Sequence, residues 1–252
     1  RRPAFAHTWT EHVATGQAEV IERLAGASIA VVNKLRLDAD TLAALPDLRM
    51  VAIAATGYNN IDLEACRAHG IVVSNVRGYA RETVPEHVFA LLLALARQIG
   101  PFHQSVAAGR WQKSEQFCYF DYPIRDLAGR TLGILGSGVL GDGVARLAEA
   151  FGMRVLRGER KGVAEVREGY TGFEQLIREA DVISLHCPLN DSTRHMIGAA
   201  ELAAMKPGTL LINTARGGLV DEQALATALR AGHIAAGFDV ETAPLPVTAG
   251  AD

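Results

Sequence analysis

The residues with the clearest chemistry form the glycine-rich segment 136–141. In order they are Gly136, Ser137, Gly138, Val139, Leu140 and Gly141. The apolar run 131–135 before them is typical of a buried strand. Apolar residues then recur on one face of an expected helix, at Leu140, Val144, Leu147 and Phe151. Glycines let the backbone approach a pyrophosphate, and a helix N-terminus offers that anion unpaired N–H groups. The segment therefore predicts a dinucleotide-binding turn.

An acidic residue completes this pattern. Residues 153–156 are expected to form the next strand, and Glu159 follows it. An acid at this place accepts hydrogen bonds from the ribose hydroxyls of the adenosine half of the cofactor. Glu159 would repel a 2′-phosphate, which favours NAD as the cofactor. Arg160 and Lys161 follow directly and could accommodate such a phosphate, so NADP stays open.

Arg216 is the second candidate for chemistry. It follows the expected strand 209–213, after Thr214 and Ala215, and two glycines come directly after it. Its guanidinium is always charged and has a rigid donor fork that suits a carboxylate or a polarised carbonyl. A surface salt bridge is the alternative, but the position at the carboxyl end of a strand favours a functional role.

The elements that would position these residues fall into two series of alternating strands and helices. In the first, strands are expected at 29–32, 50–54 and 71–73, and helices near 17–25, 39–45 and 62–69. A long apolar helix is expected over 84–97. The second series has strands at 131–135, 153–156, 181–185, 209–213 and 234–240. Such alternation predicts an α/β fold with two doubly wound parallel-sheet domains.

Composition narrows the class of protein further. The 252 residues are 49% hydrophobic and 21% charged, with a formal net charge of -3. No apolar run approaches the roughly 20 residues of a membrane span, and the charge gives no attraction to nucleic acid. Three scattered cysteines and the lack of CxxC or HExxH spacing argue against disulfides and metal sites. We expect a cytoplasmic protein, and the start at Arg1 suggests a truncated N-terminus.

Several segments together resemble the D-isomer-specific 2-hydroxyacid dehydrogenases, especially the glycerate dehydrogenase and hydroxypyruvate reductase branch. The resemblance covers nearly the whole chain and rests on 55–62 (ATGYNNID), 84–87 (VPEH), the glycine-rich segment, 185–189 (LHCPL) and the Arg216 motif. It implies a flavodoxin-like substrate domain over 1–98 and a connecting segment with a hinge over 99–128. A Rossmann dinucleotide-binding domain would occupy 129–252, with an incomplete C-terminal end.

The resemblance also implies a role for individual residues. Backbone N–H groups at Thr56 and Gly57 would bind the substrate carboxylate, and Arg216 would clamp the carboxylate and polarise the carbonyl that is reduced. Asp239 would lie near the nicotinamide carboxamide. Other residues expected to border the cofactor are Thr83, the segment 136–141, Glu159, Arg160, His186, Cys187, Pro188, Thr193, Thr214, Ala215 and Arg216. His186 would not be the catalytic acid, and His87 is expected to be a packing or hinge residue.

The sequence departs from the family pattern where the general acid should lie. The family pairs a histidine with a glutamate, and the glutamate's expected position holds Pro244. Glu241 is a weak candidate, and no histidine follows His233. Either the chain is degenerate and inactive, or segments are missing near its end. We favour the second explanation, because the cofactor segment and the substrate arginine are both retained.

The expected function is hydride transfer between NAD(P)H and C2 of a small 2-oxo acid such as glyoxylate or hydroxypyruvate. A catalytically inactive, dinucleotide-sensing protein like the dehydrogenase-related co-repressors is one alternative. A related formate- or phosphite-type dehydrogenase is another. Family members usually pair through the cofactor domain, so we expect a homodimer to which the aromatic segment 111–122 contributes.

Overall fold

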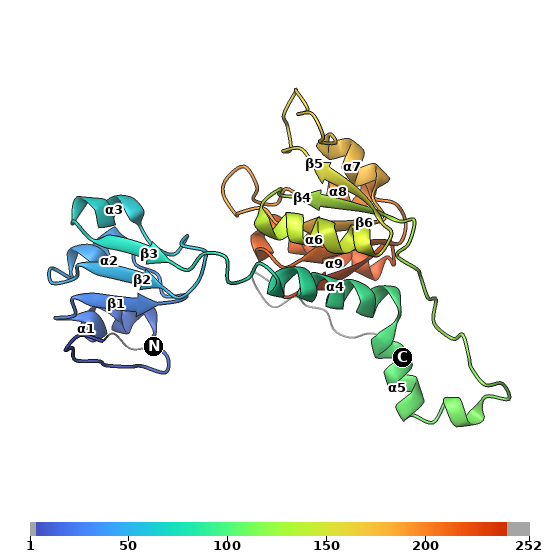
Figure 1. The fold of residues 1–252 in the computed structure, drawn as a ribbon, viewed down its shortest axis with the longest axis horizontal. Coiled ribbons are helices and arrows are strands. Elements are labelled where there is room, and N and C mark those ends of the chain that lie inside the picture. The colour runs from blue at the N-terminus through green and yellow to red at the C-terminus, as the bar shows by residue number, and fades with distance from the viewer. Residues whose placement is uncertain (1–3, 241–252) are drawn as a thin grey trace. The chain divides into compact units, whose positions relative to one another are not determined.

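The computed structural model describes residues 4–240, and its chain divides into two compact units that meet between Tyr79 and Ala80 (Figure 1). This division differs from the expected domain boundary at residue 98, because the helix that follows Ala80 packs with the second unit. The assignment of residues 1–98 to a substrate domain and of 99–128 to a connecting segment with a hinge stays a prediction. No helix in residues 4–240 is long and apolar enough to cross a membrane.

The first unit is a three-stranded parallel sheet with helices against one face. Its strands are β1 (Ile29–Val32), β2 (Met50–Ile53) and β3 (Val72–Asn75), in that spatial order. The short helices η1 (Gln17–Glu19), α1 (Val20–Leu24), α2 (Ala39–Ala43) and α3 (Leu63–Ala68) complete it. Asp38 and Asp62 cap α2 and α3 by accepting backbone N–H groups at 3.1 and 2.9 Å. Such caps fix where short helices begin.

The second unit contains a five-stranded parallel sheet with the spatial order β5-β4-β6-β7-β8. The strands are β4 (Thr131–Leu135), β5 (Arg154–Gly158), β6 (Val182–Leu185), β7 (Thr209–Asn213) and β8 (Ile234–Phe238). The chain moves outward from β4 to β5 and then returns to the other side of β4 as β6. The carboxyl ends of β4 and β6 therefore form a topological switch point, where ligands of such sheets bind.

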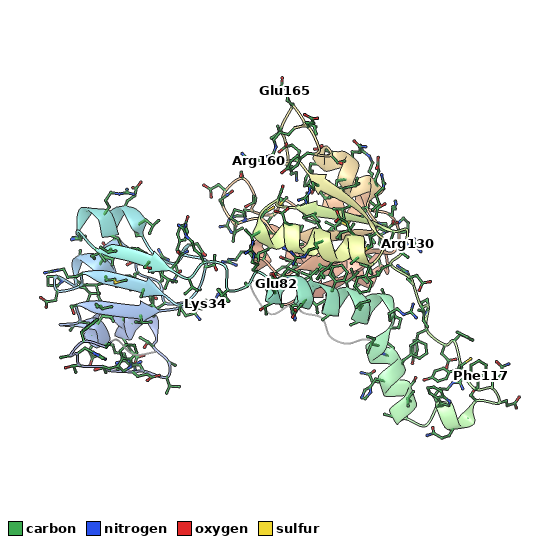
Figure 2. All side chains as sticks on the ribbon, in the orientation of Figure 1. Lys34, Glu82, Phe117, Arg130, Arg160 and Glu165 are labelled. Carbon is green, nitrogen blue, oxygen red and sulfur yellow. The ribbon has the colours of Figure 1, made fainter. Side chains whose placement is uncertain are left out.

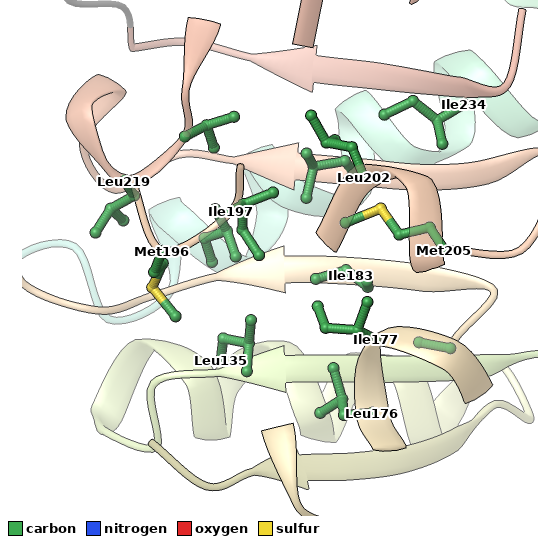
Figure 3. Close-up of a cluster of buried hydrophobic side chains, with 14 of the residues drawn as sticks. Leu135, Leu176, Ile177, Ile183, Met196, Ile197, Leu202, Met205, Leu219 and Ile234 are labelled. Atoms are coloured by element: carbon green, nitrogen blue, oxygen red, sulfur yellow. The ribbon is translucent and has the colours of Figure 1, made fainter. Parts of the chain in front are cut away.

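Helices cover both faces of this sheet, as the sequence predicts. On one face, α4 (Thr83–Ala96) and α6 (Val139–Ala150) enclose a core that includes Val88, Leu92 and Val144. On the other face lie α7 (Phe173–Glu179), α8 (Ala199–Ala204) and α9 (Glu222–Arg230), with the short helix η3 (Gly217–Leu219). Their shared core contains Leu176, Ile177 and Ile183 (Figure 3). The α/β fold class with parallel sheets is confirmed, and the second unit has the doubly wound arrangement.

The segment between the two series contains a helix that the sequence pattern did not reveal. After α4 the chain turns at Gln98, whose φ of 53° is left-handed, and then forms α5 (Ile99–Ala107) and η2 (Trp111–Lys113). Gly100 and Pro101, which usually interrupt helices, lie in the first turn of α5. Proline is tolerated there because its missing N–H would be unpaired anyway.

The buried side of α6 consists of Val144, which was expected there, and of small residues in place of the other apolar residues that were expected. The helix exists as predicted, but Leu140 and Leu147 are only half-buried and Phe151 is exposed, with its ring stacked on Phe89. The buried residues are Gly141, Gly143, Val144, Ala145 and Ala148. A methyl group built on Gly143 would lie 2.6 Å from Cγ of Pro85 in α4. Close contact between α4 and α6 therefore requires glycine at this position.

We predict that Gly143→Ala destabilises the protein, although alanine is intrinsically better in a helix by about 1 kcal/mol. Overpacking of a tight contact costs about 1–3 kcal/mol, so the net loss should be at most about 2 kcal/mol. Urea unfolding measures it. The control is Glu149→Ala on the exposed side of the same helix, where the change should stay within about 0.5 kcal/mol. Equal or greater stability of Gly143→Ala would contradict the packing argument.

Candidate functional site

The glycine-rich loop after β4 lies directly against the loop after β6. Gly136 has a φ of 107°, and a methyl group on it would lie 2.5 Å from the carbonyl carbon of His186. A methyl group on Gly141 would lie 2.3 Å from the carbonyl oxygen of Gly136. Only glycine permits these approaches. The structure thus brings two of the predicted cofactor-binding segments together at the switch point.

Two further features fit a dinucleotide at this edge of the sheet. Helix α6 begins after Gly138 without a hydrogen bond from a capping side chain, so its first N–H groups are free of that competition for an anion. At the end of β7, the buried Oγ1 of Thr214 has no hydrogen-bond partner among residues 4–240. A buried hydroxyl of this kind calls for a ligand atom, because leaving it unpaired is costly. Both features lie in segments where the sequence predicts cofactor contacts.

A cavity of about 630 Å³ lies beside the glycine-rich loop. The predicted cofactor residues that line it are Gly136, Ser137, Glu159, Arg160, Cys187, Pro188 and Thr193. The cavity is also lined by residues without a recognisable motif, namely Val163, Arg167, Asn190, Ser192 and Met196. Most of these follow β6 on the loop after Pro188, so the strand end was a signal for them. Arg167 had no such signal, because its loop shows no periodic pattern.

Glu159 is 3% exposed and hydrogen-bonded on both carboxylate oxygens. Arg167 Nε donates to Oε2 at 2.5 Å and Arg167 Nη2 donates to Oε1 at 2.9 Å. These bonds, followed by the one from the backbone N–H of Arg160, lower the pKa of Glu159 to about 2. The acid is therefore ionised, as predicted, but it is paired with a partner that the sequence did not reveal.

His186 and Cys187 follow β6 and are both poor candidates for acid–base chemistry. Burial lowers the pKa of His186 to about 4 and raises the pKa of Cys187 to about 11. The His186 ring lies 2.9 Å, at Nε2, from Oγ of the buried Ser184. Near neutral pH the imidazole is neutral and the thiol is protonated. This agrees with the expectation that His186 is not the general acid.

Arg216 lies in a turn that a buried asparagine holds together. The side chain of Asn213 is fully buried, donates from Nδ2 to the Arg216 carbonyl at 2.9 Å and accepts the Ala215 N–H at 3.1 Å. Arg216 Nη1 donates to the Ala215 carbonyl at 2.7 Å. No carboxylate in the described part of the chain forms an ion pair with Arg216. The alternative of a surface salt bridge therefore finds no support there.

The remaining predicted residues have varied surroundings. Thr193 fastens the loop after β6, donating to the Pro188 carbonyl at 2.7 Å. Thr83 is exposed in the first turn of α4, and Thr56 and Gly57 follow β2 in the first unit. Thr56 Oγ1 donates to the Val76 carbonyl at 2.9 Å. Glu241 lies outside the described residues. Within 4–240, no group of three or more His, Cys, Asp or Glu side chains could hold a metal ion.

Asp239 follows β8 and faces His87 of α4, with 3.5 Å between Oδ2 and Nε2. The His87 side chain is 46% exposed. It is therefore not a core-packing residue, because a packing role would bury its ring. Whether His87 acts as a hinge stays a prediction.

Residues 89–249 match the family model described as the NAD-binding domain of the D-isomer specific 2-hydroxyacid dehydrogenases. The chain is 52% identical to a glycerate dehydrogenase of Methylorubrum extorquens, over 94% of this chain and 74% of the relative. It is 36% identical to a hydroxypyruvate reductase of Blautia hydrogenotrophica, over 90% and 71%. Identity to a glyoxylate reductase of Thermococcus litoralis is 42%, over 81% and 64%.

Solved structures show the same fold with either dinucleotide. An acyclic imino acid reductase in complex with NADPH and D-Arg has a TM-score of 0.81 and 32% identity, over 91% of this chain and 73% of that one. A D-lactate dehydrogenase of Aquifex aeolicus complexed with NAD and lactic acid has a TM-score of 0.76 and 33% identity, over 88% and 67%.

The lowered pKa of His186 predicts a pH dependence of stability. Between pH 6.5 and about 4 the unfolded chain binds a proton that the folded protein excludes at His186. The free energy of unfolding should therefore fall as the pH falls through this window, by up to about 1.4 kcal/mol per unit from this group. His186→Gln removes this contribution. Urea unfolding from pH 8 to 4 measures the free energy of unfolding of the wild-type protein and of the variant. The difference between these two free energies should be constant above pH 7 and should become smaller below it. A constant difference throughout would contradict it.

Proposed function

The chain belongs to the D-isomer specific 2-hydroxyacid dehydrogenase family, and from this premise we propose that it reduces hydroxypyruvate or glyoxylate at C2. The class of activity is NAD(P)-dependent oxidoreduction of small 2-hydroxy and 2-oxo acids. The choice between the two named substrates rests on relatives that carry the names glycerate dehydrogenase, hydroxypyruvate reductase and glyoxylate reductase. The three free cysteines are consistent with a reducing, cytoplasmic compartment.

Arg216 is the observation that carries this proposal. Its guanidinium has no carboxylate partner in residues 4–240, yet the backbone that holds it is tied by the buried Asn213. A fixed turn whose guanidinium spares one N–H for the Ala215 carbonyl and pairs with no described carboxylate suits an anionic ligand with a planar carboxylate. Arg216 would bind the carboxylate of the 2-oxo acid and stabilise the negative charge that develops on the carbonyl oxygen.

The other residues would hold and orient the reactants. The Gly136 loop and the first turn of α6 would bind the pyrophosphate, and Thr214 Oγ1 would satisfy its hydrogen bond with the cofactor. Backbone N–H groups at Thr56 and Gly57 would bind the substrate carboxylate. The dinucleotide supplies the hydride when it is bound. His186 stays neutral and orients the cofactor, and Glu241 remains a candidate for the proton donor outside the described residues.

We expect Arg216→Ala to lower kcat/KM for hydroxypyruvate and glyoxylate by about 10³-fold, because a charge-assisted bidentate interaction with the transition state is lost. NADH binding should change by less than about threefold, which tryptophan fluorescence can measure. The kcat/KM of Arg216→Lys should lie between those of the wild type and Arg216→Ala, since lysine keeps the positive charge without the planar pair of donors. Arg178→Ala, on the exposed surface of α7, serves as the control. Unchanged turnover in Arg216→Ala would end the proposal.

We also propose that the protein forms a homodimer through the segment after α5. This segment is internally ordered, because Arg110 forms a bidentate pair with Asp121 at 2.6 and 2.9 Å and its guanidinium lies over the Tyr119 ring. Phe117 and Phe120 nevertheless remain 89% and 77% exposed (Figure 2 labels Phe117). Exposed aromatic side chains on a pre-ordered segment are typical of an interface.

A double variant, Phe117→Ser with Phe120→Ser, should therefore weaken self-association. Each phenylalanine buried in an interface contributes about 1.5–3 kcal/mol, so the dimer dissociation constant should rise more than about 100-fold. Sedimentation velocity over a range of concentrations measures it. Phe5→Ser, which changes an exposed phenylalanine of the first unit, should leave the constant unchanged. A wild-type protein that sediments as a monomer would refute the dimer.

A further inference from the structure

The carboxylate of Glu159 has no acceptor capacity left for a ribose. Oε1 accepts from the Arg160 N–H at 2.9 Å and from Arg167 Nη2 at 2.9 Å. Oε2 accepts from Arg167 Nε at 2.5 Å and from the Arg167 N–H at 3.4 Å. A carboxylate offers about four lone-pair sites, and four donors occupy them. A ribose hydroxyl can therefore bind Glu159 only by displacing Arg167.

Arg167 keeps donors available while it holds Glu159. A guanidinium has five N–H donors. The pair with Glu159 uses the Nε–H and one N–H of Nη2, so three donors remain. The Arg167 side chain is 53% exposed, lines the cavity and lies 3.9 Å over the Tyr170 ring. The loop that carries it is fastened where Glu159 N–H donates to the Thr171 carbonyl at 2.8 Å. The free edge of Arg167 is thus held in place beside the cavity.

The two neighbouring cations, Arg160 and Lys161, differ in their ion pairs and hydrogen bonds. Lys161 pairs with Glu201 at 2.8 Å and donates to the Met196 carbonyl at 3.0 Å. The side chain of Arg160 has no ion pair or hydrogen bond with any residue in 4–240, although it lines the same cavity. Arg160, labelled in Figure 2, belongs to the loop that follows β5. Of these two cations, Arg160 is the one whose charge stays available to a ligand.

These pairings change the charge that a cofactor meets. The sequence suggests a bare Glu159 carboxylate that repels a phosphate. In the structure Arg167 neutralises Glu159, Glu201 neutralises Lys161, and the charge of Arg160 remains. An arginine near the end of this strand is the feature that accommodates the 2′-phosphate of NADP in dinucleotide-binding folds. The local field therefore attracts a 2′-phosphate instead of excluding it.

We propose that Arg167, supported by Arg160, sets the cofactor choice by binding the 2′-phosphate of NADPH while it keeps Glu159 from the ribose hydroxyls. The inference rests on the proposed function, because it concerns the same cofactor site. It makes Glu159 the anchor of Arg167, where the sequence suggested a direct ribose ligand. NADPH then gains two guanidinium contacts, and NADH gains no contact with Glu159.

The first test compares kcat/KM for NADPH and NADH with hydroxypyruvate as substrate. Arg167→Gln should lower the NADPH-to-NADH ratio at least tenfold, because the phosphate loses its contact and the carboxylate is freed for the ribose. A change of less than threefold in Arg167→Gln would overturn the proposal.

Arg160→Gln keeps the proposal testable if Arg167→Gln disturbs the loop, since the Arg160 side chain forms no hydrogen bond or ion pair with any residue in 4–240. It should lower the ratio about tenfold, because kcat/KM for NADPH falls more than kcat/KM for NADH. The matched control is Lys161→Gln, which removes one positive charge from the same loop at a residue already paired with Glu201. Its ratio should change less than threefold. An equal change in the two variants would show a general charge effect and overturn the assignment.

A binding experiment without turnover tests the role of Arg167 separately from the proposed reductase activity. Titration calorimetry on the full chain with 2′,5′-ADP and with ADP measures the 2′-phosphate contribution directly. Arg167→Gln should weaken 2′,5′-ADP binding at least tenfold and change ADP binding less than threefold. Equal weakening of both nucleotides would overturn the role of Arg167 and leave the reductase intact. Failure of the wild-type protein to bind either nucleotide would overturn the cofactor site, and with it the proposed function.

Discussion

The candidate site depends on one close contact, the approach of the Gly136 backbone to the backbone of His186. A methyl group at residue 136 would lie 2.5 Å from the His186 carbonyl carbon, which is shorter than any van der Waals contact of carbon atoms. This contact joins the loops that follow β4 and β6. Because these strands flank the switch point of the sheet, it also determines where a dinucleotide can lie.

The same principle of fixed backbone and free side chain applies at the end of β7. Asn213 is a polar residue with no exposed surface, so its amide must find partners within the protein. It finds them in the turn that leads to Arg216. The side-chain amide of Asn213 therefore hydrogen-bonds the backbone and stabilises the turn that carries Arg216. No ion pair between the Arg216 guanidinium and a carboxylate is needed for that. An arginine held in this way keeps its charge for a ligand.

Most of the fold could be predicted, because short apolar runs alternate with segments of helical periodicity along the sequence. The eight expected strands all exist, and their parallel order follows from the alternation with helices. Two features escaped prediction for physical reasons. Helix α5 begins beside Gly100 and Pro101, which usually interrupt helices but are tolerated in a first turn. The buried side of α6 consists of small residues, because close contact with Pro85 leaves no room for larger ones.

The site shows a deeper limit of prediction, which Glu159 makes explicit. Its position after β5 follows from the strand–turn–helix–strand pattern, and the structure confirms that position. Its availability depends on Arg167, eight residues later on a loop without periodicity, and no local rule pairs the two. A motif specifies where a carboxylate lies, but its partners decide whether it can bind a hydroxyl or only anchor an arginine. The chemistry of the adenosine end is therefore a property of the folded loop rather than of the motif.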